Sequence, residues 1–166
     1  MYKRQGLILS ISVIGRVAKK KITYRKGAKE NDLVVVTGDL GSSYLGLQIL
    51  EREKGVFQEN PDIQPKLEGY DDLIKKQIQP IARQDVIDMF EELDLVPSAM
   101  IDISDGLASE VLHIAKSSDC SVSLYSDKLP MTEKLIVTAE ELNLDPYMCA
   151  MNGGCLLYTS PSPRDY

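Results

Sequence analysis

The sequence predicts an α/β fold in which helices pack on a mixed sheet. Apolar or alternating runs at 6–17, 33–37 and 121–125 are typical of strands. Segments with helical spacing of apolar residues lie between and after these runs. The chain has 166 residues, of which 43% are hydrophobic and 27% charged, which is enough for one domain with a substantial core.

The first expected strand covers residues 6–17, where small, polar and β-branched residues alternate. Gly15 and Arg16 stand near its end. A guanidinium at the end of a strand can bind a phosphate or a carboxylate with its planar fork. An arginine on the surface is the commoner case, so this feature alone leaves the role of Arg16 open.

The second expected strand is the wholly apolar run 33–37, which follows a turn at 27–32. The glycine-rich segment 38–43 then leads into a helix from about residue 43 to 54. This order suggests phosphate binding, but neither the P-loop spacing nor the dinucleotide fingerprint is present. We therefore favour a tight turn in which the second glycine, Gly41, lets the helix and the sheet approach closely.

Two short helices are expected after a proline-containing surface loop at 57–69. They cover about 70–79 and 84–93, and Pro80 prevents the first from continuing. Arg83 lies between them, where it can face a site or pair with Asp85. Pairing is the expected outcome.

The stretch 99–107 is the centre of the chain, because an apolar strand candidate runs through a polar turn into a helix over 106–118. Asp102, Ser104 and Asp105 lie in the turn. Carboxylates suit Mg²⁺, which takes one or two protein carboxylates together with water and substrate phosphate, and a helix N-terminus favours phosphate. Alternatively, Ser104 or Asp105 is only the N-cap and Asp102 a solvated turn residue. The spacing leaves both possibilities open.

The C-terminal third is expected to hold a strand at 121–125, a helix at 132–142 and the start of another at Pro146. His113 is the only histidine and lies on the central helix. No nucleophile is arranged around it in the sequence, so a packing or solvated role is expected.

Composition argues against several classes of protein. A net charge of −6 opposes binding to a nucleic-acid backbone. No apolar run reaches the roughly 18 to 20 residues that span a bilayer, and the N-terminus lacks the layout of a secretory signal. The cysteines, Cys120, Cys149 and Cys155, are odd in number and lack metal-ligand spacing, which favours a reducing cytoplasm.

Both ends differ from the rest of the chain. Residues 1–5 precede the first strand abruptly, and 155–166 form a Ser/Pro-containing tail without periodicity. Both resemble translated adaptor DNA that flanks a gene fragment, so fold predictions apply to residues 6–154.

Several motifs together resemble the thiamine-monophosphate kinase family, which belongs to a superfamily with aminoimidazole ribonucleotide synthetase. The most specific is Asp102-Ile103-Ser104-Asp105-Gly106-Leu107, because the sibling enzymes carry glycine-rich variants there. The other matching segments are Val13-Ile14-Gly15-Arg16, Gly27-Ala28 with Asp32, Val34 to Gly38, Tyr44 to Leu47, Pro80 with Arg83, His113-Ile114, Ser118 to Cys120, and Asn152-Gly153-Gly154.

The resemblance implies an incomplete C-terminal domain of an aminoimidazole ribonucleotide synthetase-like fold. Residues 6–24 would be the last strand region of the N-terminal ATP-binding domain, and 25–154 a partial C-terminal α/β domain. The N-terminal domain, with most of the magnesium-binding aspartates of the family, has no counterpart here. Cys155 stands where the family has a glutamate that contacts substrate. The chain alone is therefore expected to be inactive, and its unpaired strands are expected to favour association.

The resemblance also implies an activity: ATP- and Mg²⁺-dependent phosphorylation of thiamine monophosphate to thiamine diphosphate, by a homodimer when full-length. Asp102 and Asp105 would bind Mg²⁺, and Ser104 and Arg16 would contact ATP. No residue is expected to act as a covalent nucleophile, since phosphoryl transfer depends on positioning and charge neutralisation. Two alternatives are a sibling ATP-dependent synthetase and a non-catalytic nucleotide-binding module.

Overall fold

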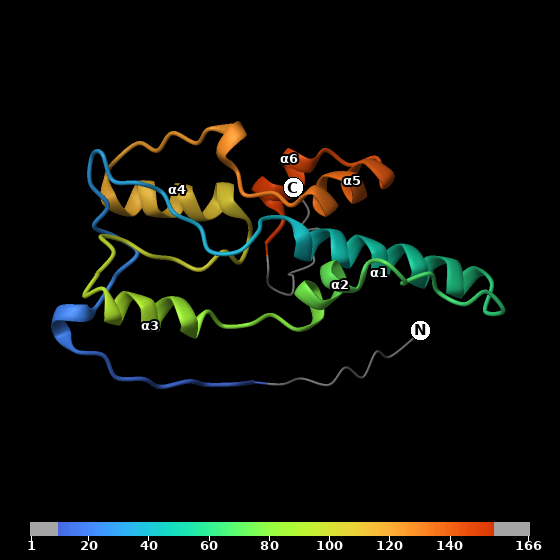
Figure 1. The fold of residues 1–166 in the computed structure, drawn as a ribbon, viewed down its shortest axis with the longest axis horizontal. Helices are drawn as coiled ribbons and strands as arrows, with labels where there is room; N and C mark the ends of the chain where they lie inside the picture. The colour runs from blue at the N-terminus through green and yellow to red at the C-terminus, as the bar shows by residue number, and fades with distance from the viewer. Residues whose placement is uncertain (1–9, 155–166) are drawn as a thin grey trace, which may run out of the picture.

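The computed structural model describes residues 10–154, and their regular secondary structure is helical (Figure 1). Every helix expected from the sequence is found, and each begins within one residue of its predicted start. The predicted end of the first helix at residue 54 is wrong, because this helix continues to Glu59, into the expected loop 57–69. The helices are α1 (Ser42–Glu59), α2 (Asp71–Ile78), α3 (Gln84–Glu92), α4 (Leu107–Ser118), α5 (Glu133–Glu141) and α6 (Pro146–Asn152), with short 3-10 turns at Lys19–Lys21 and Ser126–Lys128.

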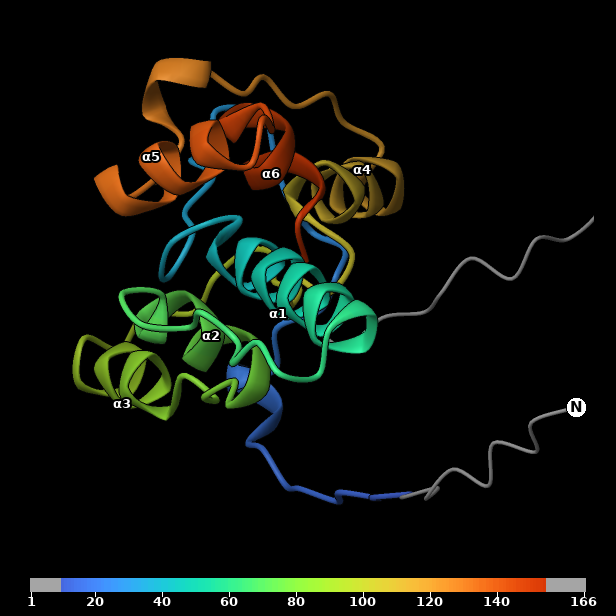
Figure 2. The ribbon, with the colours of Figure 1, turned by 90° about the vertical axis from the view of Figure 1, so that its right-hand side faces the viewer.

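The helices form two groups with α1 between them. Helices α4, α5 and α6 lie on one side of α1, and α2 and α3 lie on the other (Figures 1 and 2). The segment 10–18 runs along the lower edge of the molecule in both views, at the side opposite α4 (Figures 1 and 2).

The mixed sheet is not confirmed, because no strand is formed within residues 10–154. The segments 10–17, 33–37 and 121–125 contain no strand pairing, and residues 6–9 of the first predicted strand lie outside the described range. Leu33 and Val35 are 89% and 80% exposed. An apolar run becomes a buried strand only when neighbouring strands bind its backbone and cover its side chains, and these residues lack such neighbours in the described part.

The core consists of two clusters of buried side chains. The larger joins α1, α2, α5 and α6 through Leu45, Ile49, Leu73, Leu135, Ala139 and Cys149. The smaller joins the turn before α1 to α4 and α6 through Leu40, Leu107 and Ala150. Leu45 and Ile49 are four residues apart and so share one face of α1. The core therefore holds α1 against both groups of helices.

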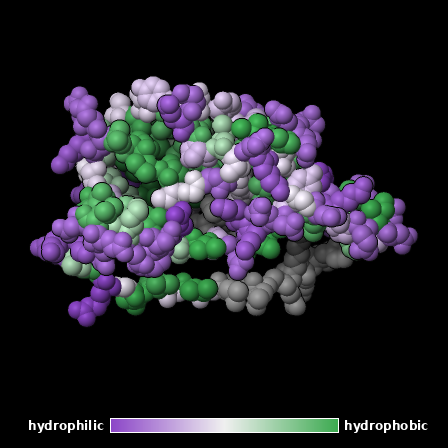
Figure 3. All heavy atoms as spheres, in the orientation of Figure 1, coloured by the Kyte–Doolittle hydropathy of each residue, from purple (hydrophilic) through white to green (hydrophobic). Residues whose placement is uncertain are grey.

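Hydrophobic side chains are exposed along the N-terminal segment, which Figure 3 shows at the lower edge of the molecule. Ile11, Val13 and Ile14 are 85%, 88% and 97% exposed.

Within the described range, none of the helices combines the length and the apolar character that a membrane crossing needs.

Candidate functional site

The turn 102–106 connects the apolar segment 99–101 to the first residue of α4. Asp102 and Asp105 are exposed, and Ser104 is partly buried. The Ser104 hydroxyl donates a hydrogen bond to Oδ2 of Asp102, at 2.5 Å. Neither carboxylate forms an ion pair with a lysine or arginine of residues 10–154. The turn therefore presents two uncompensated carboxylates to solvent.

The predicted side-chain cap of α4 is wrong. The N-cap residue is Gly106, with φ of 116°, and no side chain accepts a hydrogen bond from the first turn as a cap. The Ser104 hydroxyl donates to Asp102 and accepts no hydrogen bond from the first turn of α4. A glycine takes the cap because this φ strains residues that have a Cβ. The first backbone N–H groups of α4 therefore remain available to a ligand, in the positive field of the helix end.

The side chain of Glu110 binds the backbone of the turn from its buried side. The sequence did not predict this contact. Its residue is only 5% exposed, and its Oε1 accepts a hydrogen bond from the backbone N–H of Asp105, at 3.1 Å. The available signal was an acidic side chain in the first turn of a helix, a position that complements the helix dipole. Sequence spacing could not show that the side chain turns inward.

The C-terminal end of α6 packs directly against the same turn. A Cβ on Gly106 would lie 2.7 Å from the backbone of Asn152, and a Cβ on Gly154 would overlap the carbonyl of Ser104. Only glycine allows this approach of backbone to backbone. Gly154 is therefore needed to seat the turn, whereas Gly153 lies against Cys149, Tyr44 and Gly41.

The glycine-rich segment before α1 meets α6 as well. Gly41 has φ of 82°, and a Cβ there would lie 2.9 Å from the carbonyl group of Cys149. The expected close approach thus occurs, but the neighbour is a helix and not a sheet. The side chains of this segment already have partners: Asp39 pairs with Lys76 at 2.9 Å, and the buried Ser43 hydroxyl donates to Gln77 at 2.6 Å. These contacts support the prediction of a structural turn.

Lys76 and Ser42 determine the charge state of Asp39. Burial raises the pKa of this carboxyl, but the hydrogen bonds from Ser42 and Lys76 and the charge of Lys76 outweigh it, so the pKa of Asp39 is lowered. Asp39 is therefore ionised and partly buried beside an exposed lysine, whereas the carboxylates of the turn 102–106 are open to solvent.

The two arginines singled out in the sequence lie elsewhere. Arg16 is exposed and belongs to the segment 10–18 at the lower edge of the molecule, and the described structure does not bring this segment to the turn (Figures 1 and 2). Arg83 pairs with Asp85, with Nε to Oδ1 at 2.9 Å and Nη2 to Oδ2 at 2.8 Å, which confirms the expected pairing. His113 is exposed on α4, consistent with a solvated side chain.

The residues of the turn fit a magnesium ion that takes most of its ligands from water and phosphate. Within residues 10–154, no group of three or more His, Cys, Asp or Glu side chains converges on a metal position. Mg²⁺ needs no such protein cage and is commonly held by one or two carboxylates. Asp102 and Asp105 supply that number.

The cysteines lie outside this turn. Cys149 is buried, which raises its pKa, Cys120 is partly buried, and Cys155 lies outside the described residues.

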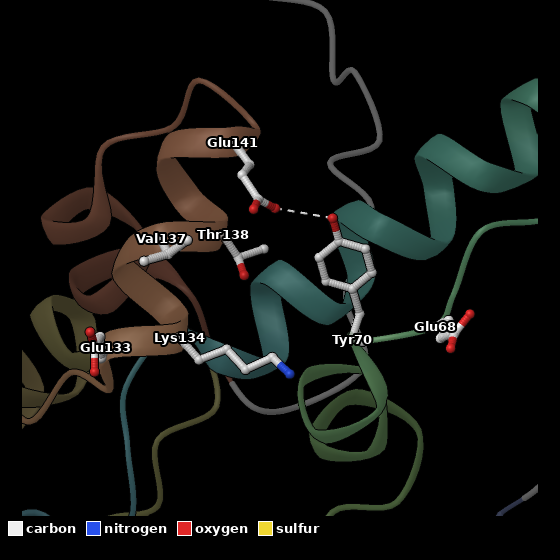
Figure 4. Close-up of a pocket in the computed structure, with 8 residues that line it drawn as sticks. Glu68, Tyr70, Glu133, Lys134, Val137, Thr138 and Glu141 are labelled. Atoms are coloured by element: carbon white, nitrogen blue, oxygen red, sulfur yellow. Dashed lines mark hydrogen bonds between the residues drawn. The ribbon is translucent and has the colours of Figure 1, made fainter.

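Two cavities lie near the larger core cluster. One of about 230 Å³ is lined by Tyr44, Leu144, Asp145, Met148, Cys149, Asn152 and Gly153, so it adjoins the end of α6 that seats the turn. The other, of about 470 Å³, opens between α5 and the start of α2 and contains no residue of the turn (Figure 4). There the Tyr70 hydroxyl donates to Glu141 at 3.0 Å, and Lys134 extends toward Tyr70. The smaller cavity is therefore the one next to the candidate site.

Curated proteins similar to this chain include thiamine-monophosphate kinases. The thiamine-monophosphate kinase of Aquifex aeolicus is 31% identical over 165 residues, covering 98% of this chain and 49% of the relative. That of Buchnera aphidicola subsp. Schizaphis graminum is 34% identical over 149 residues, covering 89% of this chain and 42% of the relative. This chain is a homologue of the thiamine-monophosphate kinases. It spans about half the length of the curated relatives it matches.

Solved structures of thiamine-monophosphate kinases show the same path of the backbone. A structure described as AaThiL complexed with AMPPCP and TMP matches with a TM-score of 0.67 and 31% identity, over 80% of this chain and 39% of that one. The enzyme of Stenotrophomonas maltophilia K279a matches with a TM-score of 0.66 and 25% identity, over 83% and 41% of the two chains. No family model matches the chain.

Proposed function

We propose that this chain is part of an ATP- and Mg²⁺-dependent kinase that converts thiamine monophosphate to thiamine diphosphate. The observation that carries the proposal is the turn 102–106, which presents two carboxylates and a serine at the open N-terminus of α4. Homology to thiamine-monophosphate kinases supports the substrate, and the relative complexed with AMPPCP and TMP supports a nucleoside triphosphate as the donor. In this reaction, a phosphate oxygen of thiamine monophosphate bonds to the γ-phosphorus of ATP, the bond to the β-phosphate oxygen breaks, and ADP leaves.

Each residue of the turn has a distinct role in this proposal. Asp102 and Asp105 would hold Mg²⁺, which neutralises phosphate charge when bound. Ser104 Oγ would donate to a phosphate oxygen in place of Asp102. The uncapped backbone N–H groups at the start of α4 would favour the same anion. These groups position and neutralise the phosphates, and none of them forms a covalent intermediate.

The remaining parts of the proposal concern the longer protein. Arg16 would contact ATP only after the segment 10–18 has moved toward the turn or been placed by further parts of the protein. We propose the domain limits 6–24 and 25–154, with residues 1–5 and 155–166 as foreign tails, which lie outside the described residues. We further propose a cytoplasmic homodimer as the full-length form, and no activity for this chain alone. Sequencing the source locus across Gln5 and Cys155 tests the domain limits.

The activity is tested in the full-length protein that contains these residues. With ATP, Mg²⁺ and thiamine monophosphate, we expect thiamine diphosphate to form, measured by chromatography after conversion to a fluorescent thiochrome. Asp102→Ala and Asp105→Ala should each lower kcat by about 100-fold or more, the usual size for loss of a group that stabilises transition-state charge. Asp127→Asn removes an exposed carboxylate outside the site and serves as the control.

Other results would contradict the proposal. Turnover of ATP only with a different acceptor would identify a sibling synthetase. Binding of ATP without turnover of any acceptor would identify a non-catalytic nucleotide-binding module.

A further inference from the structure

We infer that Glu110 is a positioning residue that holds the turn 102–106 in the shape that binds metal and phosphate. The inference rests on the proposed function, since it concerns the same turn. Glu110 is not itself a predicted ligand: its residue is 5% exposed and lies in the first turn of α4, beneath the exposed carboxylates of Asp102 and Asp105.

The hydrogen bond of Glu110 fixes the peptide unit between two proposed ligands. Its Oε1 accepts from the N–H of Asp105, at 3.1 Å, and this N–H belongs to the peptide that joins Ser104 to Asp105. The backbone N–H of Glu110 donates to the carbonyl of Gly106, at 3.2 Å. Glu110 therefore ties the turn to the first turn of α4 through both its main chain and its side chain.

A buried carboxylate needs compensation from hydrogen bonds or from favourable charge. Glu110 forms no ion pair with a lysine or arginine of residues 10–154, so the Asp105 N–H and the positive end of α4 are its stabilising partners. Moving Asp105 away would leave the carboxylate without this hydrogen bond. The energetic cost of that loss keeps the turn in place.

Among residues 10–154, the contacts on the opposite side of the turn are close backbone packing. Gly106 and Gly154 allow the backbones of the turn and of the α6 end to touch, and neither contact is a hydrogen bond to the Asp105 peptide. Glu110 is thus the polar tether of a turn that is otherwise held by packing. A binding group held in its productive geometry before the ligand arrives pays a smaller ordering cost on binding.

The test compares Glu110→Gln with Glu110→Met in the 166-residue chain. Both variants lose the charge and keep the approximate length of the side chain, but only glutamine keeps an acceptor for the Asp105 N–H. Amide hydrogen exchange of Asp105, followed by NMR, reports the tether. Mn²⁺-induced broadening of the Asp102 and Asp105 resonances, titrated with the metal alone, reports the binding geometry. Unfolding by denaturant reports stability.

In Glu110→Met, we expect the Asp105 amide hydrogen to exchange about five-fold faster, as the loss of one hydrogen bond predicts. The same broadening should then require about five-fold more Mn²⁺. Glu110→Gln should stay within about two-fold of the original chain in both measurements. Stability should not fall in Glu110→Met, because it also removes a buried charge. Glu133→Met is the matched control, since Glu133 is an exposed acidic residue in the first turn of α5.

The inference is overturned if Glu110→Met leaves the exchange of Asp105 unchanged, or if Glu110→Gln is as impaired as Glu110→Met. It is also overturned if exchange becomes faster without any change in Mn²⁺ binding, because Glu110 then serves stability alone. Absence of Mn²⁺ broadening in the original chain would contradict the proposed metal site, whereas the exchange measurement would still decide whether Glu110 holds the turn.

Discussion

At the scale of single residues, Asp39 links the segment before α1 to α2 through its charge. Its side chain is 15% exposed and lies 2.9 Å from Nζ of Lys76. The lowered pKa means that the folded state binds a proton less readily than the unfolded state does. Asp39 thus contributes stability above the ordinary aspartate pKa of about 3.9, and this contribution is lost as the pH falls through the lower pKa of the folded state.

We therefore expect Asp39→Asn to lower the free energy of unfolding at neutral pH and to flatten its decline between about pH 5 and pH 2. Urea unfolding at a series of pH values measures both effects. Asp127→Asn removes a carboxylate from an exposed pair with Lys128 and should follow the original chain. Parallel pH curves for Asp39→Asn and the original chain would show that the Lys76 pair has no role in stability.

Gly106 and Gly55 provide a second comparison at this scale. Gly106 has φ of 116° and its missing Cβ would lie 2.7 Å from the backbone of Asn152, whereas nothing lies within 4 Å of the corresponding position at Gly55 in α1. Gly106→Ala should cost about 1–3 kcal/mol through backbone strain and displacement of α6. Gly55→Ala should stabilise α1 by about 0.5–1 kcal/mol, because alanine is the better helix former. Thermal unfolding measures both, and equal effects would refute the packing of α6 on the turn.

At the scale of secondary-structure elements, α5 and α4 begin in different ways. Thr132 is the N-cap of α5, and its hydroxyl accepts from the N–H of Leu135 at 3.1 Å. Ser104 precedes α4 but donates to Asp102 instead of capping. We expect Thr132→Ala to cost about 1 kcal/mol of stability and Ser104→Ala to change it by less than about 0.5 kcal/mol. Unfolding by denaturant measures the stability of both variants. An equal loss of stability in Ser104→Ala would show that Ser104 caps α4.

The elements also show how far the sequence determines this structure. Helices α1 to α6 were predictable because apolar spacing, prolines and caps act between residues that are close in sequence. The Arg83–Asp85 pair was predictable for the same reason, since the two side chains are two residues apart. The turn 102–106 was singled out as a candidate site because its polar residues lie close together in the sequence. These features need no knowledge of distant contacts.

The parts that failed or were missed depend on distant segments. The run 33–37 has the composition of a buried strand, but burial requires neighbouring strands that the described residues do not supply. The inward direction of the Glu110 side chain depends on the packing of α6 against the turn 102–106. This packing places the Asp105 N–H within hydrogen-bond distance of the Glu110 carboxylate. The position of Arg16 depends on whatever the segment 10–18 packs against. Local patterns cannot supply these relations.

At the scale of the whole molecule, the apolar side chains of the N-terminal segment are among the most exposed. Val13 and Ile14 are 88% and 97% exposed, and Figure 3 shows hydrophobic side chains along this edge. An extended apolar segment with unpaired backbone groups is a template for pairing with another chain. The chain also spans about half the length of the curated relatives it matches.

We expect the chain to self-associate at micromolar concentrations and the double change Val13→Lys with Ile14→Lys to shift it toward the monomer, because charge on an exposed edge prevents pairing. Sedimentation velocity at several concentrations measures the shift. Ile78→Lys adds charge at a separate exposed apolar position, 67% exposed at the end of α2, and should leave association largely unchanged. If Ile78→Lys reduces association as much as the double change, then general solubility and not the N-terminal segment controls it. A monodisperse original chain would show that this segment is compatible with a free-standing module, the alternative to a part of a longer kinase.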